Sequence, residues 1–289
     1  MLKPLLKTMR LRQWTKNAIL LAAIVFDRQF FVVPSLVKTF AGLILFCLLS
    51  SCIYIINDIV DVEADRAHPT KRNRPIAAGT LPVRVAVAAC VVMLLLVFSS
   101  AFWLSTSFAI IALIYLLVNL AYSNWLKHIP IIDVMIIALG FVLRVAAGVS
   151  LIHIERFSPW LYVVTILGAL YLGFGKRRAE LALLQNGGNQ QRKVLEGYTL
   201  AFLDQILVIV SSATLIAYSL YTFLAPSVPE NHSLMLTIPI ILYGIFRYLY
   251  LVQVKNEGGA PEELLLTDRP LQATVVLWGL TILAVFYLL

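Results

Sequence analysis

The sequence predicts an all-α membrane protein, a polytopic bundle of about nine transmembrane helices. The chain of 289 residues is 61% hydrophobic and only 13% charged, which is too apolar for a water-soluble protein of this size. It also contains nine apolar runs of roughly the length that crosses a bilayer, near 17–35, 36–56, 83–104, 107–122, 130–152, 158–175, 199–225, 234–253 and 270–289. We expect these runs to form one transmembrane domain over residues 1–289.

The segment before the first run, residues 1–16, is predicted to be an amphipathic helix in the membrane surface. On a helix its apolar side chains share one face and its basic side chains another, namely Leu2, Leu5, Leu6 and Met9 against Lys3, Lys7 and Arg10. An ordinary basic anchor explains the same pattern equally well. The first run is the weakest of the nine because Asp27 and Arg28 interrupt it.

The distribution of basic residues predicts the orientation of the chain. If the amino terminus is cytoplasmic, 18 of the 23 Lys and Arg residues lie in the cytoplasmic segments and helix mouths. The opposite side holds only Arg28, Lys38 and Arg156. This asymmetry follows the positive-inside rule. The basic excess is therefore explained by topology, and no nucleic-acid partner is expected.

The longest charged segment follows the second run and reads NDIVDVEADRAHPTKRNRPIAAG, residues 57–79. On a helix Asp58, Asp61 and Asp65 fall within about 60° of one another, whereas Glu63 points away. Carboxylates so close repel unless a cation lies among them, and a purely oxygen ligand set favours Mg²⁺. The alternative is a solvated acidic helix end that pairs with the bases that follow it.

The stretch NDIVDVEAD resembles the NDxxDxxxD signature of the UbiA-type membrane prenyltransferase superfamily. That resemblance implies nine transmembrane helices around a central cavity that opens to the cytoplasm, with a magnesium diphosphate site at its mouth. It assigns metal binding on the diphosphate of the donor to Asn57, Asp61 and Asp65, with Asp58 beside them. The catalytic residues would then be the three aspartates.

A second acidic motif of the superfamily, of DxxxD type, is absent from this sequence. The corresponding stretch is GKRRAELALL, residues 175–184, in which Lys176 and Arg177 replace carboxylates. Basic side chains bind anionic oxygens directly, so this loop would suit a substrate with more phosphate than a prenyl diphosphate. The alternative is a surface pair between Lys176 and Glu180, one helical turn apart.

One branch of the superfamily shares this departure, the decaprenyl-phosphate phosphoribosyltransferases. The sequence resembles that branch in NDIVDVEADRAHPTKRNRPIAAG and in four other stretches: RLRQWTKN (10–17), YSNWLKHIPIIDVMIIALGFVLRVAAG (122–148), KRRAEL (176–181) and EELLLTDRPLQ (262–272). The resemblance implies Mg²⁺-dependent transfer of 5-phosphoribose from 5-phosphoribosyl 1-diphosphate to a polyprenyl phosphate of decaprenyl type, with release of diphosphate. It also implies a bacterial-type inner membrane, an active site that faces the cytoplasm and a role in cell-envelope biosynthesis.

Two other functions each explain part of the sequence. A prenyltransferase that joins a prenyl diphosphate to an aromatic acceptor keeps the acidic site but leaves the basic KRRAEL stretch unexplained. A transporter would account for ionisable residues within spans, but the acidic cluster has no counterpart at the far side. Homo-oligomerisation is left open.

The basic residues near the predicted mouths are assigned to the two substrates. The donor phosphates would contact Lys71, Arg74, Lys127, Lys176 and Arg177. The acceptor would contact Arg12, Gln13, Trp14, Lys16 and Arg144. The alternative for Lys71 and Arg74 is positive-inside topology, and the alternative for Trp14 and its neighbours is an aromatic belt at the interface. Arg144 lies inside a span, where it needs either a partner such as Asp204 or a bound anion.

Overall fold

The computed structural model consists of helices and the turns that join them. It describes residues 1–69, 71–153, 158–185, 193–226 and 228–288, and no β-strand occurs in these ranges. Arg156, which supported the predicted orientation, lies outside them. Seven helices of the described part are long and apolar enough to cross a membrane, judged by length and composition. The predicted all-α membrane class is thereby confirmed.

Two of the nine predicted spans are not among these seven helices. The run 17–35 is divided between a 3₁₀ helix η1 (Leu11–Leu21), the short α2 (Ala22–Phe26) and the start of α3 (Val33–Val60). The chain turns at Arg28, whose φ is 57°, and Pro34 lies in the first turn of α3, where proline suits a helix start. Helix α8 (Trp160–Gln185) is 26 residues long, but it continues through the charged KRRAE sequence.

The chain divides into two compact units. Unit 1 consists of Met1–Asn124 and the segment that starts at Leu143, and unit 2 consists of Trp125–Val142 and the C-terminal part of the chain. Helix α7 (Ile132–Val149) contributes residues to both units. Each unit has its own hydrophobic core.

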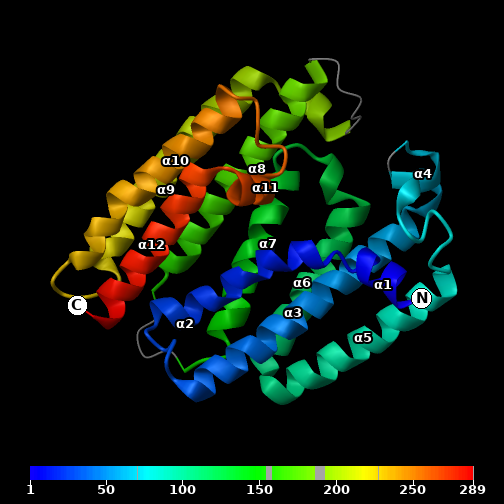
Figure 1. The fold of residues 1–289 in the computed structure, drawn as a ribbon, viewed down its shortest axis with the longest axis horizontal. Helices are drawn as coiled ribbons and strands as arrows, with labels where there is room; N and C mark the ends of the chain where they lie inside the picture. Colours follow the sequence, from blue (N-terminus) through cyan, green and yellow to red (C-terminus); the bar gives the residue numbers. More distant parts are fainter. Residues whose placement is uncertain (70, 154–157, 186–192, 227, 289) are drawn as a thin grey trace. The chain divides into compact units, whose positions relative to one another are not determined.

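Unit 1 is arranged around the long helix α3. Its other elements are α1 (Leu2–Thr8), η1, α2, α4 (Val62–Ala67), the 3₁₀ turn η2 (Lys71–Asn73), α5 (Val83–Leu104) and α6 (Thr106–Asn124). Helices α3 and α5 lie side by side (Figure 1). Phe46 packs edge to face against Phe108 of α6. A Cβ on Gly148 would lie 2.1 Å from the carbonyl oxygen of Leu20, so a glycine is needed where α7 meets η1.

Unit 2 is built on the pair α8 and α9 (Leu200–Leu224), which lie side by side. Its remaining elements are η3 (Leu126–His128), the first part of α7, η4 (Lys193–Gly197), η5 (Ser233–Thr237), α10 (Ile238–Gln253), α11 (Pro261–Thr267) and α12 (Arg269–Tyr287). Two helices begin with side-chain caps, because Thr199 accepts a hydrogen bond from the amide of Phe202 and Asp268 accepts one from Leu271.

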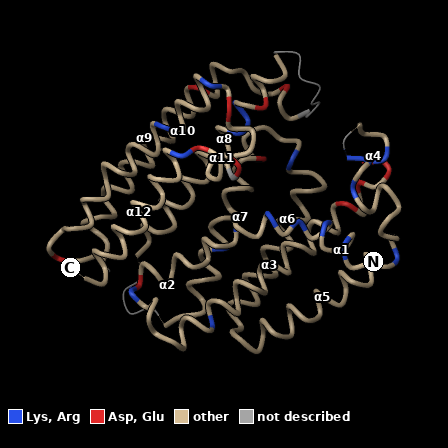
Figure 2. Tube along the Cα trace, viewed as in Figure 1, with Lys and Arg blue, Asp and Glu red and all other residues tan. Residues whose placement is uncertain are grey.

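Charged residues gather at helix ends in both units. In unit 1 several of them lie on α4 and the turn after it and others on α1 and η1, whereas α5 carries few over most of its length (Figure 2). Helix α5 instead exposes Val92, Leu95 and Leu96, the kind of surface that lipid chains cover. In unit 2 a charged group lies at the end of α8. Both positions agree with the cost of charges inside a bilayer.

Candidate active site

The acidic motif lies at the junction between α3 and α4. Sequence reasoning placed its three aspartates on one uninterrupted helix, but α3 ends at Val60 and α4 begins at Val62. Asp61 is the junction residue, with φ −87° and ψ 8°. Aspartate favours helix ends because its side chain competes with the helical backbone for hydrogen bonds. The interruption is small, since the amide of Asp65 still donates to the carbonyl of Asp61 at 2.8 Å.

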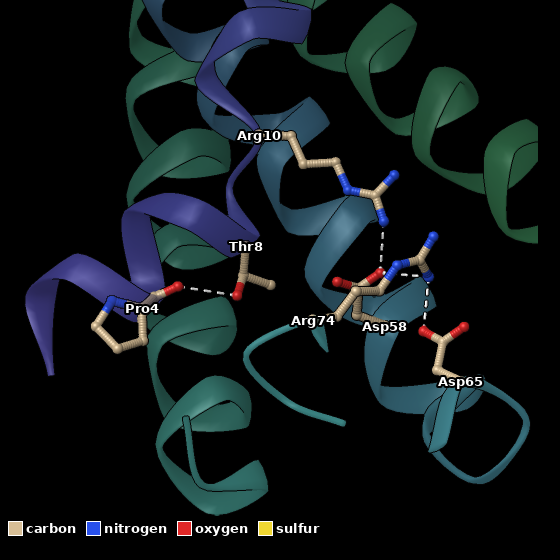
Figure 3. Close-up of polar contacts among 6 residues, drawn as sticks. All are labelled: Pro4, Thr8, Arg10, Asp58, Asp65 and Arg74. Carbon is tan, nitrogen blue, oxygen red and sulfur yellow. Dashed lines mark hydrogen bonds and ion pairs between the residues drawn. The ribbon is translucent and has the colours of Figure 1, made fainter. Parts of the chain in front are cut away.

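Asp58 and Asp65 are held together by arginines (Figure 3). Arg74 Nη1 lies 2.6 Å from Asp65 Oδ2 and 3.2 Å from Asp58 Oδ1. Arg10 Nη2 lies 2.6 Å from that same Asp58 oxygen. The two carboxylates are almost fully buried, with 2% and 3% of their side chains exposed. Two buried negative charges are therefore balanced by two guanidinium groups, which lowers the cost of removing them from water.

Sequence reasoning expected a divalent metal to relieve the repulsion among the aspartates. In the structure Arg10 and Arg74 relieve it. Among the described residues no group of three or more His, Cys, Asp or Glu side chains is arranged to hold a metal ion. Glu63, expected to point away, is 80% exposed and pairs with Arg66.

The donor atoms that remain are nevertheless those that Mg²⁺ prefers. Among the described residues, no hydrogen bond reaches Asp58 Oδ2, Asp65 Oδ1, the carboxylate of Asp61 or the side-chain amide of Asn57. Mg²⁺ usually takes one or two carboxylates and completes its coordination with waters and substrate phosphates. The residues present therefore fit a magnesium ion that a phosphorylated substrate would share, although they do not form a complete cage.

Lys71 and Arg74 lie in and after η2, the turn that follows α4. Lys71 is exposed, and its ammonium group has no ion-pair partner among the described residues. Arg74 was expected to contact phosphate oxygens, and here it contacts the two aspartates. In unit 2, Lys127 in η3 and Lys176 in α8 are partly buried. The structure brings Arg74 to the acidic motif, and Lys71 lies three residues before it.

Arg177 has carboxylate partners within unit 2. Its Nε lies 2.7 Å from Asp133 Oδ2, and its Nη1 donates to Glu180. Tyr198 donates to the other Asp133 oxygen at 2.7 Å and accepts from the amide of Ile131 at 2.5 Å. Burial raises the pKa of Tyr198, and Asp133 raises it further, so the phenol remains a proton donor at neutral pH. This group has the geometry of a structural ion pair.

Arg178 forms a second network, which sequence reasoning missed. It donates to Asp204, to the carbonyl of Val252 and to the side chain of Asn256. Gln253 donates to the same Asp204 oxygen at 3.1 Å. The network joins α8, α9 and the end of α10. The three consecutive basic residues in KRRAEL could have indicated this network. Successive side chains on a helix point in different directions, so all three cannot face the same site.

The N-terminal residues assigned to the acceptor lie in η1, which packs against α3. Trp14 Nε1 donates to Ser51 Oγ at 3.0 Å, and Gln13 and Lys16 are partly buried, whereas Arg12 is exposed. Sequence reasoning did not assign a role in the site to the first and last residues of RLRQWTKN. Arg10 contacts Asp58, and Asn17 is fully buried. Their place at the two ends of a matched motif was the one feature of the sequence that pointed to them.

Arg144 is buried in unit 1, where Asn17 and Tyr115 are partners. Its Nε lies 2.7 Å from Asn17 Oδ1 and its Nη2 lies 2.5 Å from the Tyr115 hydroxyl. The guanidinium also lies over the Tyr115 ring, 4.8 Å from its centroid. Asp204, proposed from the sequence as a partner, accepts instead from Arg178 and Gln253. Sequence spacing could not identify these neutral partners, because they come from distant parts of the chain.

Comparison with known proteins supplies a further set of findings. The model of the UbiA prenyltransferase family matches residues 18–263. A decaprenyl-phosphate phosphoribosyltransferase of Mycolicibacterium smegmatis is 35% identical, over 98% of this chain and 92% of that protein. One of Corynebacterium glutamicum is 33% identical, over 99% and 87%. A UbiA homologue of Archaeoglobus fulgidus, solved with GPP and Mg²⁺, has the same fold, with a TM-score of 0.74, 21% identity and coverage of 98% and 99%.

Proposed function

Because this chain belongs to the UbiA prenyltransferase family, we propose that it transfers 5-phosphoribose from 5-phosphoribosyl 1-diphosphate to a polyprenyl phosphate. The observation that carries the proposal is the similarity to decaprenyl-phosphate phosphoribosyltransferases, which extends over nearly the whole chain. Diphosphate is the second product. The enzyme is thus a pentosyl transferase on a membrane scaffold.

The acidic motif is proposed to bind the diphosphate of the donor through Mg²⁺, with Asn57, Asp58, Asp61 and Asp65 as ligands. When bound, Mg²⁺ would neutralise the charge that develops on the departing diphosphate. The burial of Asp58 and Asp65 supports this assignment, because a low-dielectric site strengthens their attraction for a cation. All four residues lie on a single short segment, so the chain can supply one side of the coordination shell.

Basic residues are proposed to bind the phosphate oxygens of the donor. Lys71 is suited to this because its ammonium group is exposed near the acidic motif. Lys127 and Lys176 of unit 2 are proposed to act in the same way. Arg177, assigned to the same task from the sequence, is 1% exposed and bonded to Asp133, so we propose that it supports the helix from which Lys176 projects.

The acceptor phosphate is proposed to bind near Arg12, Gln13, Trp14 and Lys16, with Arg144 deeper in unit 1. An oxygen of the lipid phosphate attacks ribose C1 as the bond to the diphosphate oxygen breaks. A phosphate monoester is largely ionised at neutral pH, so it needs no protein nucleophile and no strong general base. The protein contributes positioning and charge stabilisation.

The setting of the reaction is part of the proposal. A polyprenyl phosphate resides in a membrane, and the seven spanning helices give the enzyme access to it. We propose that the protein resides in the inner membrane of a bacterium, with the active site facing the cytoplasm. The product would serve cell-envelope biosynthesis.

The test uses purified protein in detergent with Mg²⁺. Labelled 5-phosphoribosyl 1-diphosphate is incubated with a polyprenyl phosphate, and labelled prenyl diphosphate is incubated in parallel with 4-hydroxybenzoate. We expect label in the extracted lipid only from the sugar donor, and only without EDTA. Prenylated aromatic product alone would favour the rival prenyltransferase activity, for which the shared fold with the GPP-bound homologue is the supporting observation.

A further inference from the structure

Arg10 lies outside the acidic motif but contacts its most buried member. Its Nη2 is 2.6 Å from Asp58 Oδ1. Arg74 Nη1 reaches the same oxygen at 3.2 Å and extends to Asp65 Oδ2 at 2.6 Å. Arg10 therefore contacts one carboxylate, whereas Arg74 bridges two, as Figure 3 shows. The two arginines are not equivalent, and the difference suggests different roles.

The backbone around Arg10 is fixed against α3. Ser51 Oγ donates to the carbonyl of Met9 at 3.0 Å and accepts from the indole of Trp14 at 3.0 Å. The residues before Arg10 are buried, since Thr8 is 1% exposed and Met9 is 7% exposed. Arg10 itself has φ 52°, a left-handed conformation that a non-glycine residue adopts only when its surroundings impose it.

The side chain of Arg10 is fixed along the same face of α3. Its guanidinium lies over the Tyr54 ring, 4.7 Å from the centroid. Ser51, Tyr54 and Asp58 are spaced by three and four residues, so they follow one face of the helix. Contacts with the backbone, the ring and the carboxylate thus hold Arg10 at successive points along α3. A group fixed in this way can fix the carboxylate that it binds.

Arg74 occupies a different position, between two carboxylates. Arg74 Nη1 lies between Asp58 Oδ1 and Asp65 Oδ2, so a divalent ion that bound these two oxygens would take the place of that nitrogen. Arg10 also contacts Asp58 Oδ1, but among the described residues it makes no ion pair with Asp65. Binding of a cation between these two oxygens is thus compatible with the Arg10 contact and incompatible with the Arg74 bridge.

We propose, building on the proposed function, that Arg10 is a positioning residue that orients Asp58 for Mg²⁺, and that Arg74 is the cation that the metal displaces from Asp58 and Asp65. Arg10 would act as an outer-shell partner of a ligating carboxylate. Arg74, once displaced, would be available to the phosphate oxygens of the donor.

The proposal predicts changes of opposite sign, which simple electrostatics does not. If the arginines acted only through their positive charge, removing either one would strengthen cation binding. If Arg10 positions Asp58, Arg10→Gln weakens binding despite the loss of a nearby positive charge, by about tenfold as for other outer-shell partners. Arg74→Gln removes the competing cation and strengthens binding by at least about fivefold, the effect of one unit charge on another across about 4 Å of water, because the ion is divalent and the carboxylates are buried.

The experiment measures binding of Mn²⁺ alone, as a spectroscopic substitute for Mg²⁺, by electron paramagnetic resonance on the full chain in detergent. Ser51→Ala is included because it loosens the segment that carries Arg10 without changing any charge, and it should weaken binding in the same direction as Arg10→Gln. Lys7→Gln is the matched control. It removes an exposed positive charge three residues from Arg10 and should leave the affinity within about twofold.

Weaker binding in Arg10→Gln and Ser51→Ala together with stronger binding in Arg74→Gln would support the proposal. Stronger or unchanged binding in Arg10→Gln would overturn it, and if that variant does not fold, unchanged binding in Ser51→Ala would do so. Asp58→Asn tests the metal site separately from the role of Arg10. Unchanged Mn²⁺ binding there would remove the metal site itself, whereas the identity of the sugar donor is tested independently by the lipid-labelling assay.

Discussion

Asp133 and Arg177 form an ion pair that is closed to water. Arg177 Nε lies 2.7 Å from Asp133 Oδ2, and the two side chains are 1% and 0% exposed. The pair links the first turn of α7 to α8 within unit 2. Its burial means that Asp133, left without Arg177, would be an uncompensated charge in an apolar environment.

Arg177→Gln should therefore destabilise the protein. Removal of one partner from a buried ion pair costs about 3–5 kcal/mol, because the remaining charge loses its counter-ion. We expect a lower apparent Tm by differential scanning fluorimetry in detergent. Arg84→Gln is the matched control, since Arg84 is exposed and has no ion-pair partner among the described residues. An unchanged Tm in Arg177→Gln would mean that the pair contributes nothing to folding.

Lys176→Gln should weaken binding of the sugar donor. A charged hydrogen bond to phosphate is worth about 1.5–3 kcal/mol, which corresponds to roughly a tenfold to hundredfold loss of donor affinity. Isothermal titration with 5-phosphoribosyl 1-diphosphate and Mg²⁺ measures this directly. Donor affinity equal to that of the unmodified chain would remove Lys176 from the proposed phosphate site, and the comparison is made at a temperature at which both proteins remain folded.

Asp268 is expected to make stability depend on pH. The hydrogen bond from Arg247 lowers the pKa of Asp268 below its usual 3.8, and the amide of Leu271 lowers it further. The lower folded-state value means that the ionised carboxylate contributes stability above the unfolded-state pKa, and that this contribution is lost as the pH falls through the folded-state value.

Apparent Tm should accordingly fall as the pH is taken below about 4, near the unperturbed aspartate pKa. Asp268→Asn should lower Tm at pH 7 and reduce that dependence, because it removes the ion pair with Arg247 and keeps the size of the side chain. Identical pH profiles for the two proteins would exclude Asp268 as a source of acid sensitivity. The effect should be modest, since both side chains retain some exposure.

The sequence predicts some helices more accurately than others. Helix α5 matches the predicted run at both ends, Val83 and Leu104, because proline precedes it and Arg84 near its start is the one charged residue in the run. The first run does not form a single span, since a polar turn divides it at Asp27 and Arg28, the two residues that marked it in the sequence as the weakest run. Helix α8 continued past the expected end because its charged residues find buried partners.

The site was predictable as a segment but not as a set of contacts. The spacing of the acidic residues predicted that Asp58 and Asp65 share one face, and both are buried. Their counter-ions could not be foreseen, because Arg10 lies 48 residues away in the sequence from Asp58 and the contact depends on how the N-terminal segment packs on α3. Tertiary contacts of this kind have no periodic signature in the sequence.

Removal of divalent metal should abolish activity reversibly. The carboxylate and amide oxygens of the acidic motif fit Mg²⁺, and a diphosphate leaving group needs charge neutralisation. We expect EDTA to stop the release of diphosphate and added Mg²⁺ to restore it, with Ca²⁺ a poor substitute because it prefers a larger coordination shell. Full activity after exhaustive chelation would contradict the proposed role of the metal.

The acidic motif provides the sharpest comparison, because it contains its own control. Asp58→Asn and Asp65→Asn each remove a buried negative charge proposed to bind Mg²⁺, and each should reduce kcat/KM by at least about 100-fold, beyond the usual effect of an outer-shell change. Glu63→Gln removes the same charge from the same segment, but Glu63 is 80% exposed and, within the described part of the chain, pairs only with Arg66. It should retain nearly full activity, since an exposed ion pair contributes little. Equal losses in all three variants would show that the segment needs its net charge, and would remove the distinction between the buried carboxylates and the exposed one.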